Sequence, residues 1–399
     1  MRLYILFIFL FTTIGAAAQR ICSVPVTAIP QVATQQANAL VPGSMLSENT
    51  IVIPVVVHVI YNSSYENISE EQIKSQIAAI NADFNRSNAD FSKIPSVFSK
   101  LSGNANIRFE LAKTDPNGRV SDGIIRKKSS RMMWSDDEKI KSSAFGGSEA
   151  WDAKSYLNVW ICNTVPGLSG YASLPGSDPT KDGVVVRYDA FGTTGKISAP
   201  YHKGRTLTHE VGHWLGLQHL WGDKQCGDDG IQDTPKQRSG NSGDPVFPKL
   251  TACNGTADGE MFMNFMDFTN DASMGMFTEG QKIAMRSQFS STGKRNSFLV
   301  SKGLSAAWND TQVASTSNVK KQVTIYPNPV VSGSISIALN GSDNTGKQFA
   351  IIASNGQIIK TGYFQQAKCE VNVTAFPPGI YQVRLTDPGA NLFAKFVKQ

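Results

Sequence analysis

The sequence has little net charge and few long apolar runs. Its 399 residues carry a formal net charge of +6, and the one local basic cluster consists of Arg126, Lys127, Lys128 and Arg131. No nucleic-acid-binding motif accompanies this cluster, so it indicates a solvated surface. With 41% hydrophobic and 18% charged residues, the composition excludes a disordered or fibrous chain and is typical of a folded globular protein. Nucleic acid is therefore not an expected partner.

The first apolar run of the chain lies at the N-terminus. Arg2 precedes the apolar residues 3–14, and three alanines at 16–18 follow them. This run is too short to span a bilayer comfortably and ends in small residues, as a secretory signal peptide does. We expect residues 1–18 to be removed as a signal peptide. No later segment is long and apolar enough to cross a membrane, so we expect an exported protein without a transmembrane segment.

Cysteine is also scarce, with five residues in a chain expected to reach a compartment that permits disulfides. An odd number leaves at least one cysteine without an internal partner. Cys162 lies in the strand-like run YLNVWICN, which favours a buried thiol. Cys226 and Cys253 flank a turn-rich stretch that needs a local link, and they are the pair expected to form a disulfide.

Changes in composition divide the chain into segments. Residues 19–48 are polar and rich in Ala and Gln, which predicts a loosely folded prosegment. Residues 49–305 begin with the apolar run IVIPVVVHVIY and continue with a helix and further strands, which predicts a mixed sheet backed by helices. A polar linker over residues 306–321 leads to residues 322–399, where short β-rich runs alternate with turns. This last pattern is typical of a small all-β sandwich, so we expect an α+β chain.

Three of the five histidines lie in one short stretch, LTHEVGHWLGLQHLWG. His209 and His213 are four residues apart, so a helix places both on one face, where both imidazoles can contact one ion. Thr206 is the expected cap of this helix. Gly216 can adopt the positive φ that ends the helix, and the chain can then bring His219 to the same ion.

Three imidazoles form the ligand set of a catalytic zinc site, which keeps a fourth position open for water. Glu210 follows His209 by about a quarter turn of helix, so its carboxylate can stand beside the ion and act as a general base. The arrangement predicts peptide-bond hydrolysis, with zinc polarising the carbonyl group. The alternative is a set of surface histidines on an amphipathic helix. His58 and His202 lie outside the motif and are expected in packing or surface roles.

The extended motif HExxHxxGxxH resembles that of the metzincin metallopeptidases, whose second mark is a methionine turn beneath the metal. MFMNFMDFTND supplies such a turn, with Met266 under the histidines. HEVGHWLGLQHLWG, CGDDGIQDTPKQ, NFMDF and MFTEGQ look like the pappalysin family, over roughly residues 50–300. The resemblance implies a twisted mixed sheet above a cleft, with the motif helix as its floor. It also implies a rim strand that binds substrate in extended form, at Gly170, Tyr171 and Ala172.

The resemblance further implies a calcium ion beside the active site. Asp229, Asp233 and Thr234 match the acidic loop of the family, and Asp223 is a further candidate ligand. Oxygen-rich spacing of this kind suits a hard cation. The alternative is a solvated acidic turn.

One family disulfide has its match in this chain, whereas two other features of the family do not. Cys226 and Cys253 match one family disulfide, whereas the second usually ends just after the turn, where Ser273 stands. We therefore expect the second disulfide to be absent. Phe268 stands where family members usually have a tyrosine whose hydroxyl supports the oxyanion of the transition state. Because phenylalanine cannot donate this hydrogen bond, we expect a slower enzyme.

Two more residues acquire roles from the resemblance. Arg20-Ile21-Cys22 is similar to the cysteine switch of metzincin proforms, in which a prosegment thiolate fills the open zinc position until proteolysis. Cys22 is then a zinc ligand in the proform, and the alternative is an incidental thiol near a processed terminus. Some pappalysins favour a basic residue after the scissile bond through an acidic group near the methionine turn, and Asp271 is the candidate for this contact.

The segments VTIYPNP, SNGQIIKTG and PPGIYQVRLTDPGANLFAKFVKQ resemble the C-terminal sorting domain of the type IX secretion apparatus. This resemblance implies a protein outside the cell or on its surface, with the secretion apparatus as a partner. A carbohydrate-binding sandwich is the alternative. Together these patterns predict a secreted, monomeric zinc endopeptidase that acts on proteins or peptides. The competing hypothesis is a surface adhesion protein on an inert metzincin scaffold, which Phe268 favours and the intact Glu210 opposes.

Overall fold

The computed structural model of the chain describes residues 21–23, 49–305, 323–331, 333–339, 348–355, 357–364, 368–385 and 393–399. These residues belong to two compact units, Met1–Asp310 and Thr311–Gln399. The expected signal peptide and linker lie outside the described residues, as does the expected prosegment apart from residues 21–23. Among the described residues, no helix is long and apolar enough to cross a membrane.

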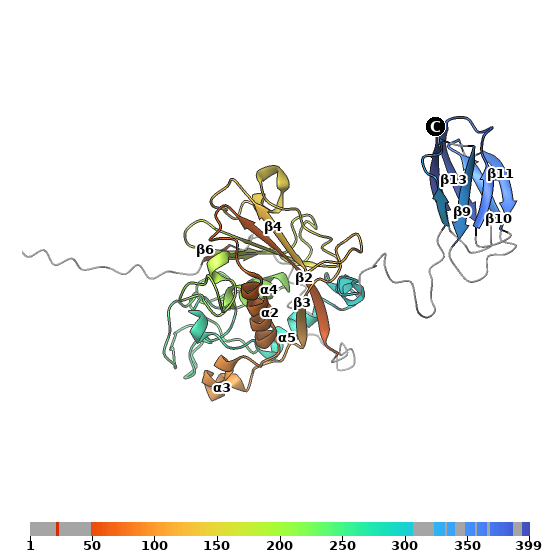
Figure 1. The fold of residues 1–399 in the computed structure, drawn as a ribbon. Helices are drawn as coiled ribbons and strands as arrows, with labels where there is room; N and C mark the ends of the chain where they lie inside the picture. The colour runs from red at the N-terminus through yellow and green to blue at the C-terminus, as the bar shows by residue number, and fades with distance from the viewer. Residues whose placement is uncertain are drawn as a thin grey trace, which may run out of the picture. The chain divides into compact units, whose positions relative to one another are not determined.

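The first unit is built on a seven-stranded sheet (Figure 1). Its central strand, β2 (Ile51–Tyr61), is buried from Ile53 to Ile60, as expected of a continuous apolar run covered on both faces. The strand order is β1-β6-β7-β5-β2-β3, and β4 also pairs with β2. The pairings are parallel, except that β6 runs antiparallel to β7. The other strands are β1 (Ile21–Ser23), β3 (Ile107–Leu111), β4 (Ile124–Lys128), β5 (Leu157–Cys162), β6 (Leu168–Ala172) and β7 (Val184–Arg187).

Two helices pack together and against the sheet. Helix α2 (Glu70–Phe84) contacts β3, and helix α4 (Arg205–Trp214) contacts β6 and β7. A continuous apolar core includes Val57 and Val159 of the sheet and Ile80 and Val211 of these helices. The remaining helical segments are α3 (Ser96–Ser99), α5 (Glu279–Ser287) and the 3₁₀ turns Ala89–Lys93, Lys139–Lys141, Ser143–Phe145, Tyr188–Ala190, Asp271–Ser273 and Asn296–Val300. The motif helix α4 therefore lies against β6.

The described residues of the second unit form two antiparallel sheets. One has the order β11-β10-β13-β14 and the other β12-β9-β8. Apolar side chains from both sheets, such as Ile337 and Val383, share one core. The prediction of an α+β chain with a small all-β domain is therefore confirmed. The strands are β8 (Val323–Tyr326), β9 (Ser334–Leu339), β10 (Gln348–Ala353), β11 (Ile358–Tyr363), β12 (Lys368–Asn372), β13 (Gly379–Leu385) and β14 (Phe393–Lys398).

Candidate metal centre and active site

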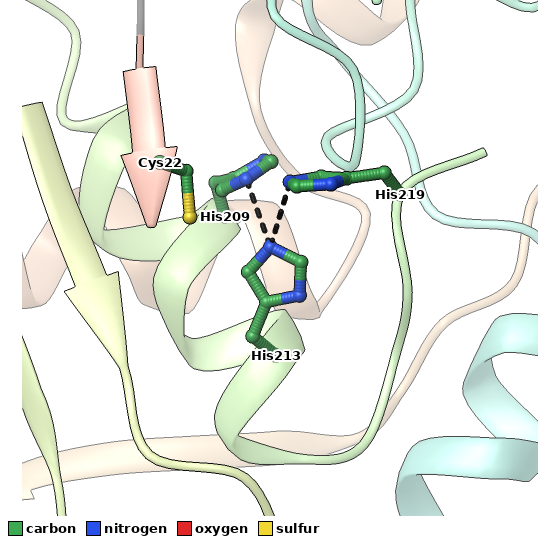
Figure 2. A group of neighbouring side chains, drawn as sticks. All are labelled: Cys22, His209, His213 and His219. Carbon is green, nitrogen blue, oxygen red and sulfur yellow. Dashed lines mark hydrogen bonds between the residues drawn. The ribbon is translucent and has the colours of Figure 1, made fainter. Parts of the chain in front are cut away.

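Helix α4 and the bend after it assemble the three histidines of the motif. His209 and His213 lie one turn apart on the helix, which is buried along its whole length. Gly216 has a φ of 92°, a left-handed conformation that favours glycine, and it turns the chain just after the helix. His219 then lies opposite the other two rings (Figure 2).

The three imidazole rings meet at their Nε2 atoms. Nε2 of His213 lies 3.1 Å from Nε2 of His209 and 3.1 Å from Nε2 of His219. All three side chains are nearly or fully buried. The motif therefore brings three histidines that span ten positions of the sequence into one compact cluster of nitrogen atoms.

Hydrogen bonds on the far side of each ring determine which nitrogen carries the proton. The Nδ1 atoms of His209, His213 and His219 lie 2.8, 2.8 and 2.6 Å from oxygens of Phe265, Leu217 and Asp223, respectively. Two of these oxygens are backbone carbonyls and the third is a carboxylate, so each accepts a hydrogen bond from a protonated Nδ1. Every Nε2 then presents its lone pair to the centre of the cluster. Lone pairs this close repel one another unless a cation lies among them, so the donor set fits a divalent metal ion.

Burial keeps the central imidazole neutral. Desolvation lowers the pKa of His213 from 6.5 to about 3, and the neighbouring His219 acts in the same direction. A neutral imidazole is the form that binds a metal. His213 therefore holds its metal-binding form throughout the ordinary pH range.

Glu210 lies beside this cluster and is 1% exposed. Its Oε2 accepts a hydrogen bond from the Cys22 thiol, with Sγ at 3.3 Å. On β6, a Cβ atom added to Gly170 would lie 2.8 Å from Oε1 of Glu210. Glycine at this position therefore lets the backbone of the expected rim strand approach the carboxylate of the expected base.

Cys22 reaches the same centre from strand β1, where it lies opposite Gly170 of β6. Its Sγ and one ring nitrogen from each of His209, His213 and His219 all lie within 4.8 Å of one another (Figure 2). No other group of three or more potential metal ligands of this kind occurs in the part of the chain that the structure describes. A piece of the expected prosegment thus covers both the histidine cluster and the edge of β6.

The expected methionine turn lies directly under α4. Met266 is fully buried, and a Cβ atom added to Gly212 of the helix would lie 2.5 Å from its Sδ. The carbonyl group that accepts the hydrogen bond from His209 belongs to the preceding residue, Phe265. The turn therefore supports the cluster both by packing and by hydrogen bonding.

Phe268 contributes an aromatic ring to the wall of the cluster. Its centroid lies 4.7 Å from that of His219 and 5.6 Å from that of His209. Trp221 lies 4.9 Å away and stacks on His219. This position therefore offers apolar surface and no hydroxyl group.

Asp223, a further candidate for the calcium site, contacts one of the three histidines. Its Oδ1 accepts the hydrogen bond from His219 at 2.6 Å and so fixes the orientation of that ring. The residue has a φ of 55°, a left-handed conformation that costs roughly 1–3 kcal/mol for a side chain other than glycine. The bond to His219 offsets part of this cost.

In the loop expected to bind calcium, the carboxylates of Asp229 and Asp233 differ in their hydrogen bonds. Asp229 is 2% exposed, and burial raises the pKa of its carboxyl group to about 7. Its Oδ1 accepts a hydrogen bond from Thr234, whereas Oδ2 is buried without a hydrogen bond to any described residue. Both carboxylate oxygens of Asp233 accept hydrogen bonds at the start of α5, from Thr278 and Gly280. The carboxylate suited to a cation is therefore that of Asp229.

Asp271, the candidate for a contact with a basic substrate residue, lies at the start of α4. It is fully buried, and its Oδ2 accepts hydrogen bonds from the backbone N–H groups of Lys203 at 2.7 Å and Arg205 at 3.3 Å. Thr206, the expected cap, lies inside α4, and Gly204 precedes the helix. Asp271 therefore stabilises the start of α4.

Arg205 is an important residue that sequence reasoning missed. Its buried guanidinium pairs with Asp83 of α2 at 3.0 Å and with Asp90 at 3.1 Å. It also lies over the ring of Phe265, at 5.4 Å from the centroid. Arg205 thus ties the first turn of α4 to α2 and to the methionine turn. Its partners are far away in sequence, so no local pattern indicates the contact.

Two links hold the long loop after His219. Cys226 and Cys253 are joined by a disulfide, which confirms the predicted pairing. Ser273, at the position of the expected missing half-cystine, donates a hydrogen bond to Oδ1 of Asp244 at 2.7 Å. A hydrogen bond therefore connects this segment where the family pattern has a covalent bond.

The side chains of strand β6 are buried. Tyr171 is 2% exposed and Ala172 is 1% exposed, and the ring of Tyr171 lies 5.1 Å from Nζ of Lys141. The outer edge of the strand pairs with β1 at Leu168, Gly170 and Tyr171. An extended peptide in the place of β1 would therefore meet the β6 backbone rather than these side chains.

Comparisons with known proteins agree with this geometry. Residues 141–290 match the model of the pregnancy-associated plasma protein-A family, and residues 324–399 match that of a secretion system C-terminal sorting domain. An extracellular metalloprotease of Arthroderma benhamiae is 30% identical over 277 residues, which are 67% of this chain and 89% of that protein.

Solved structures extend the similarity. Mature mirolysin of Tannerella forsythia in complex with a cleaved peptide is 50% identical, with a TM-score of 0.63 over 64% of this chain and 97% of that one. A mutant of promirolysin from the same organism is 49% identical, with a TM-score of 0.63 over 64% of this chain and 85% of that one.

Proposed function

The chain belongs to the pregnancy-associated plasma protein-A, or pappalysin, family of secreted metalloendopeptidases, and from this premise we propose that His209, His213 and His219 hold a catalytic zinc ion. The observation that carries the proposal is the convergence of three Nε2 lone pairs, with 3.1 Å between neighbouring nitrogens. Three neutral nitrogen ligands are typical of a catalytic zinc site that keeps one position open.

Glu210 is the proposed general base and acid. A bound zinc ion supplies Lewis acidity, which polarises the scissile carbonyl group and lowers the pKa of water. Glu210 takes a proton from the attacking water and delivers it to the nitrogen of the leaving amine, so the peptide bond is broken by net addition of water. Gly170 supports this role because its lack of a side chain leaves space for the carboxylate.

Strand β6 is the proposed binding edge for the substrate. An extended peptide can add a strand at Gly170 and Tyr171 through backbone hydrogen bonds. The pairing of β1 with these residues supports the proposal, because β1 is itself an extended segment on that edge. Any preference for particular substrate side chains must then come from residues beside the strand.

We also propose a structural calcium ion near Asp229 and Thr234, with Asp233 as a weaker candidate. Support comes from the buried Oδ2 of Asp229, which makes no hydrogen bond with the described residues. Oxygen ligands of this type suit calcium. The raised pKa of Asp229 fits a carboxyl group whose charged form needs a cation nearby.

Cys22 is proposed to keep the unprocessed chain latent. Its thiol lies against both the histidine cluster and Glu210, and its strand covers the binding edge of β6. Replacing it with alanine removes a ligand that competes with water and substrate. We expect the Cys22→Ala chain with its prosegment intact to cleave a quenched fluorescent peptide, under conditions in which the wild-type proform is silent.

Cys369→Ala is the matched control, because Cys369 is also outside the disulfide but lies in the sorting domain. This variant should remain latent. If Cys22→Ala remains as silent as the wild-type proform, Cys22 does not act as the switch.

Phe268 is proposed to limit the rate of the chemical step. A tyrosine hydroxyl at this position could donate to the oxyanion of the transition state, and such a donor is worth about 10²–10³ in kcat when fully aligned. We expect Phe268→Tyr to raise kcat by roughly tenfold with little change in KM. Steady-state kinetics on one peptide substrate provide the measurement, and a turnover no faster than that of the wild type contradicts the proposal.

A further inference from the structure

A cavity of about 230 Å³ lies at the beginning of β6, apart from the histidine cluster. Its lining includes Leu168 and Ser169 of β6, Arg187 at the end of β7, and Asp189 and Ser198 of the following segment. Its volume is of the order of one side chain. Neither the proposed metal ligands nor Glu210 line this cavity.

The cavity lies next to the path of an extended peptide on β6. Leu168 is opposite Ile21 of β1, and Gly170, two residues further along, is the residue beside Glu210. A strand advances by about 3.3 Å per residue, so Leu168 is roughly 7 Å along β6 from the proposed base. A side chain that enters the cavity therefore belongs to a residue two or three positions from the scissile bond.

The two charged groups of the cavity, Arg187 and Asp189, differ in how accessible they are to a ligand. Arg187 donates a hydrogen bond from Nε to Oδ1 of Asp189 at 2.7 Å, and its terminal Nη1 and Nη2 groups make no hydrogen bond with the described residues. The Arg187 side chain is 31% exposed and that of Asp189 is 19% exposed. The more accessible charge is therefore the guanidinium.

We propose that this cavity is a substrate subsite for an acidic side chain, aspartate or glutamate, with Arg187 as the residue that determines the preference. The proposal rests on the peptidase function proposed above. The two Nη groups can donate in parallel to one carboxylate, and the hydroxyl groups of Ser169 and Ser198 can donate as well. A lysine or arginine side chain would instead meet the positive charge of Arg187, and the carboxylate of Asp189 is the less exposed of the two charged groups.

The test compares matched peptides cleaved by the mature enzyme. One set carries glutamate, the other glutamine, in turn at each position within three residues of the scissile bond on both sides. The wild type should cleave the glutamate peptide roughly three- to tenfold better, in kcat/KM, at one position two or three residues from that bond. Arg187→Gln should abolish the difference, because cleavage of the glutamate peptide falls towards that of the glutamine peptide, and Arg187→Glu should favour lysine at that position.

The possible results distinguish a failure of the subsite proposal from a failure of the peptidase proposal on which it rests. If the wild type cleaves both peptides equally at every position, or if Arg187→Gln keeps the preference, the subsite proposal is wrong and the peptidase proposal stands. If the wild type cleaves no peptide, the peptidase proposal fails and the subsite fails with it. If Arg187→Gln loses activity on both peptides, Asp189→Asn decides: a stronger preference for glutamate supports the proposal, and no change overturns it.

Discussion

Replacing Glu210 with glutamine should reduce peptide hydrolysis by about 10²–10⁴ in kcat, without loss of the metal. Glutamine has nearly the same shape, so it fits the space beside Gly170 of β6. It cannot take a proton from water at neutral pH, and the acid–base step is lost. Since Glu210 is not among the three proposed metal ligands, the metal should remain. The measurements are steady-state kinetics on a quenched fluorescent peptide and metal content by mass spectrometry.

This variant also distinguishes the enzyme from an adhesion protein on an inert scaffold. If the wild-type mature protein hydrolyses peptides and Glu210→Gln does not, the protein is an active peptidase and Glu210 takes part in its catalysis. A variant that keeps more than about a tenth of the wild-type kcat would remove Glu210 from the role of base.

Replacing His213 with alanine should abolish both metal binding and activity. His213 is the central ring of the cluster, with its Nε2 at 3.1 Å from that of each of the other two histidines. Its removal leaves two nitrogen ligands, which is fewer than the three that a catalytic zinc site uses. Loss of the metal removes the Lewis acid from the reaction, so we expect no activity above background even at high enzyme concentration.

His202→Ala is the matched control for this experiment. His202 lies three residues before the start of α4 and takes no part in the cluster. We expect this variant to keep its metal and most of its activity. Full activity of His213→Ala would contradict the proposed ligand set, whereas equal losses in both variants would indicate general damage to the fold near α4.

The sequence was sufficient to predict features that depend on local spacing. The interval of four residues between His209 and His213, and the glycine at position 216, act within one helix and one bend. The disulfide of Cys226 and Cys253 was predicted from two residues that flank one turn-rich loop. The apolar run of β2 and the alternating runs of the second unit indicate the sheets, because the spacing of apolar residues within each run is also a local feature.

Contacts between distant segments were not predictable in this way. The start of α4 receives its hydrogen bonds from Asp271, whereas local propensity favoured Thr206 as the cap. Asp223 follows His219 closely, but its bond to that ring depends on a left-handed backbone conformation that composition does not indicate. Arg205 meets Asp83 and Asp90 only after α2 packs on α4. Tertiary packing therefore determined the partners that orient the site.

The metal content of the purified chain tests the central claim most directly. We expect one equivalent of zinc per chain in the wild-type protein, measured by mass spectrometry after dialysis, and less than about a tenth of that in His213→Ala. Chelation should remove the zinc together with the activity, and added zinc should restore both. A fully active wild-type protein without a stoichiometric metal ion, or a His213→Ala protein that still holds one zinc ion, would contradict the account.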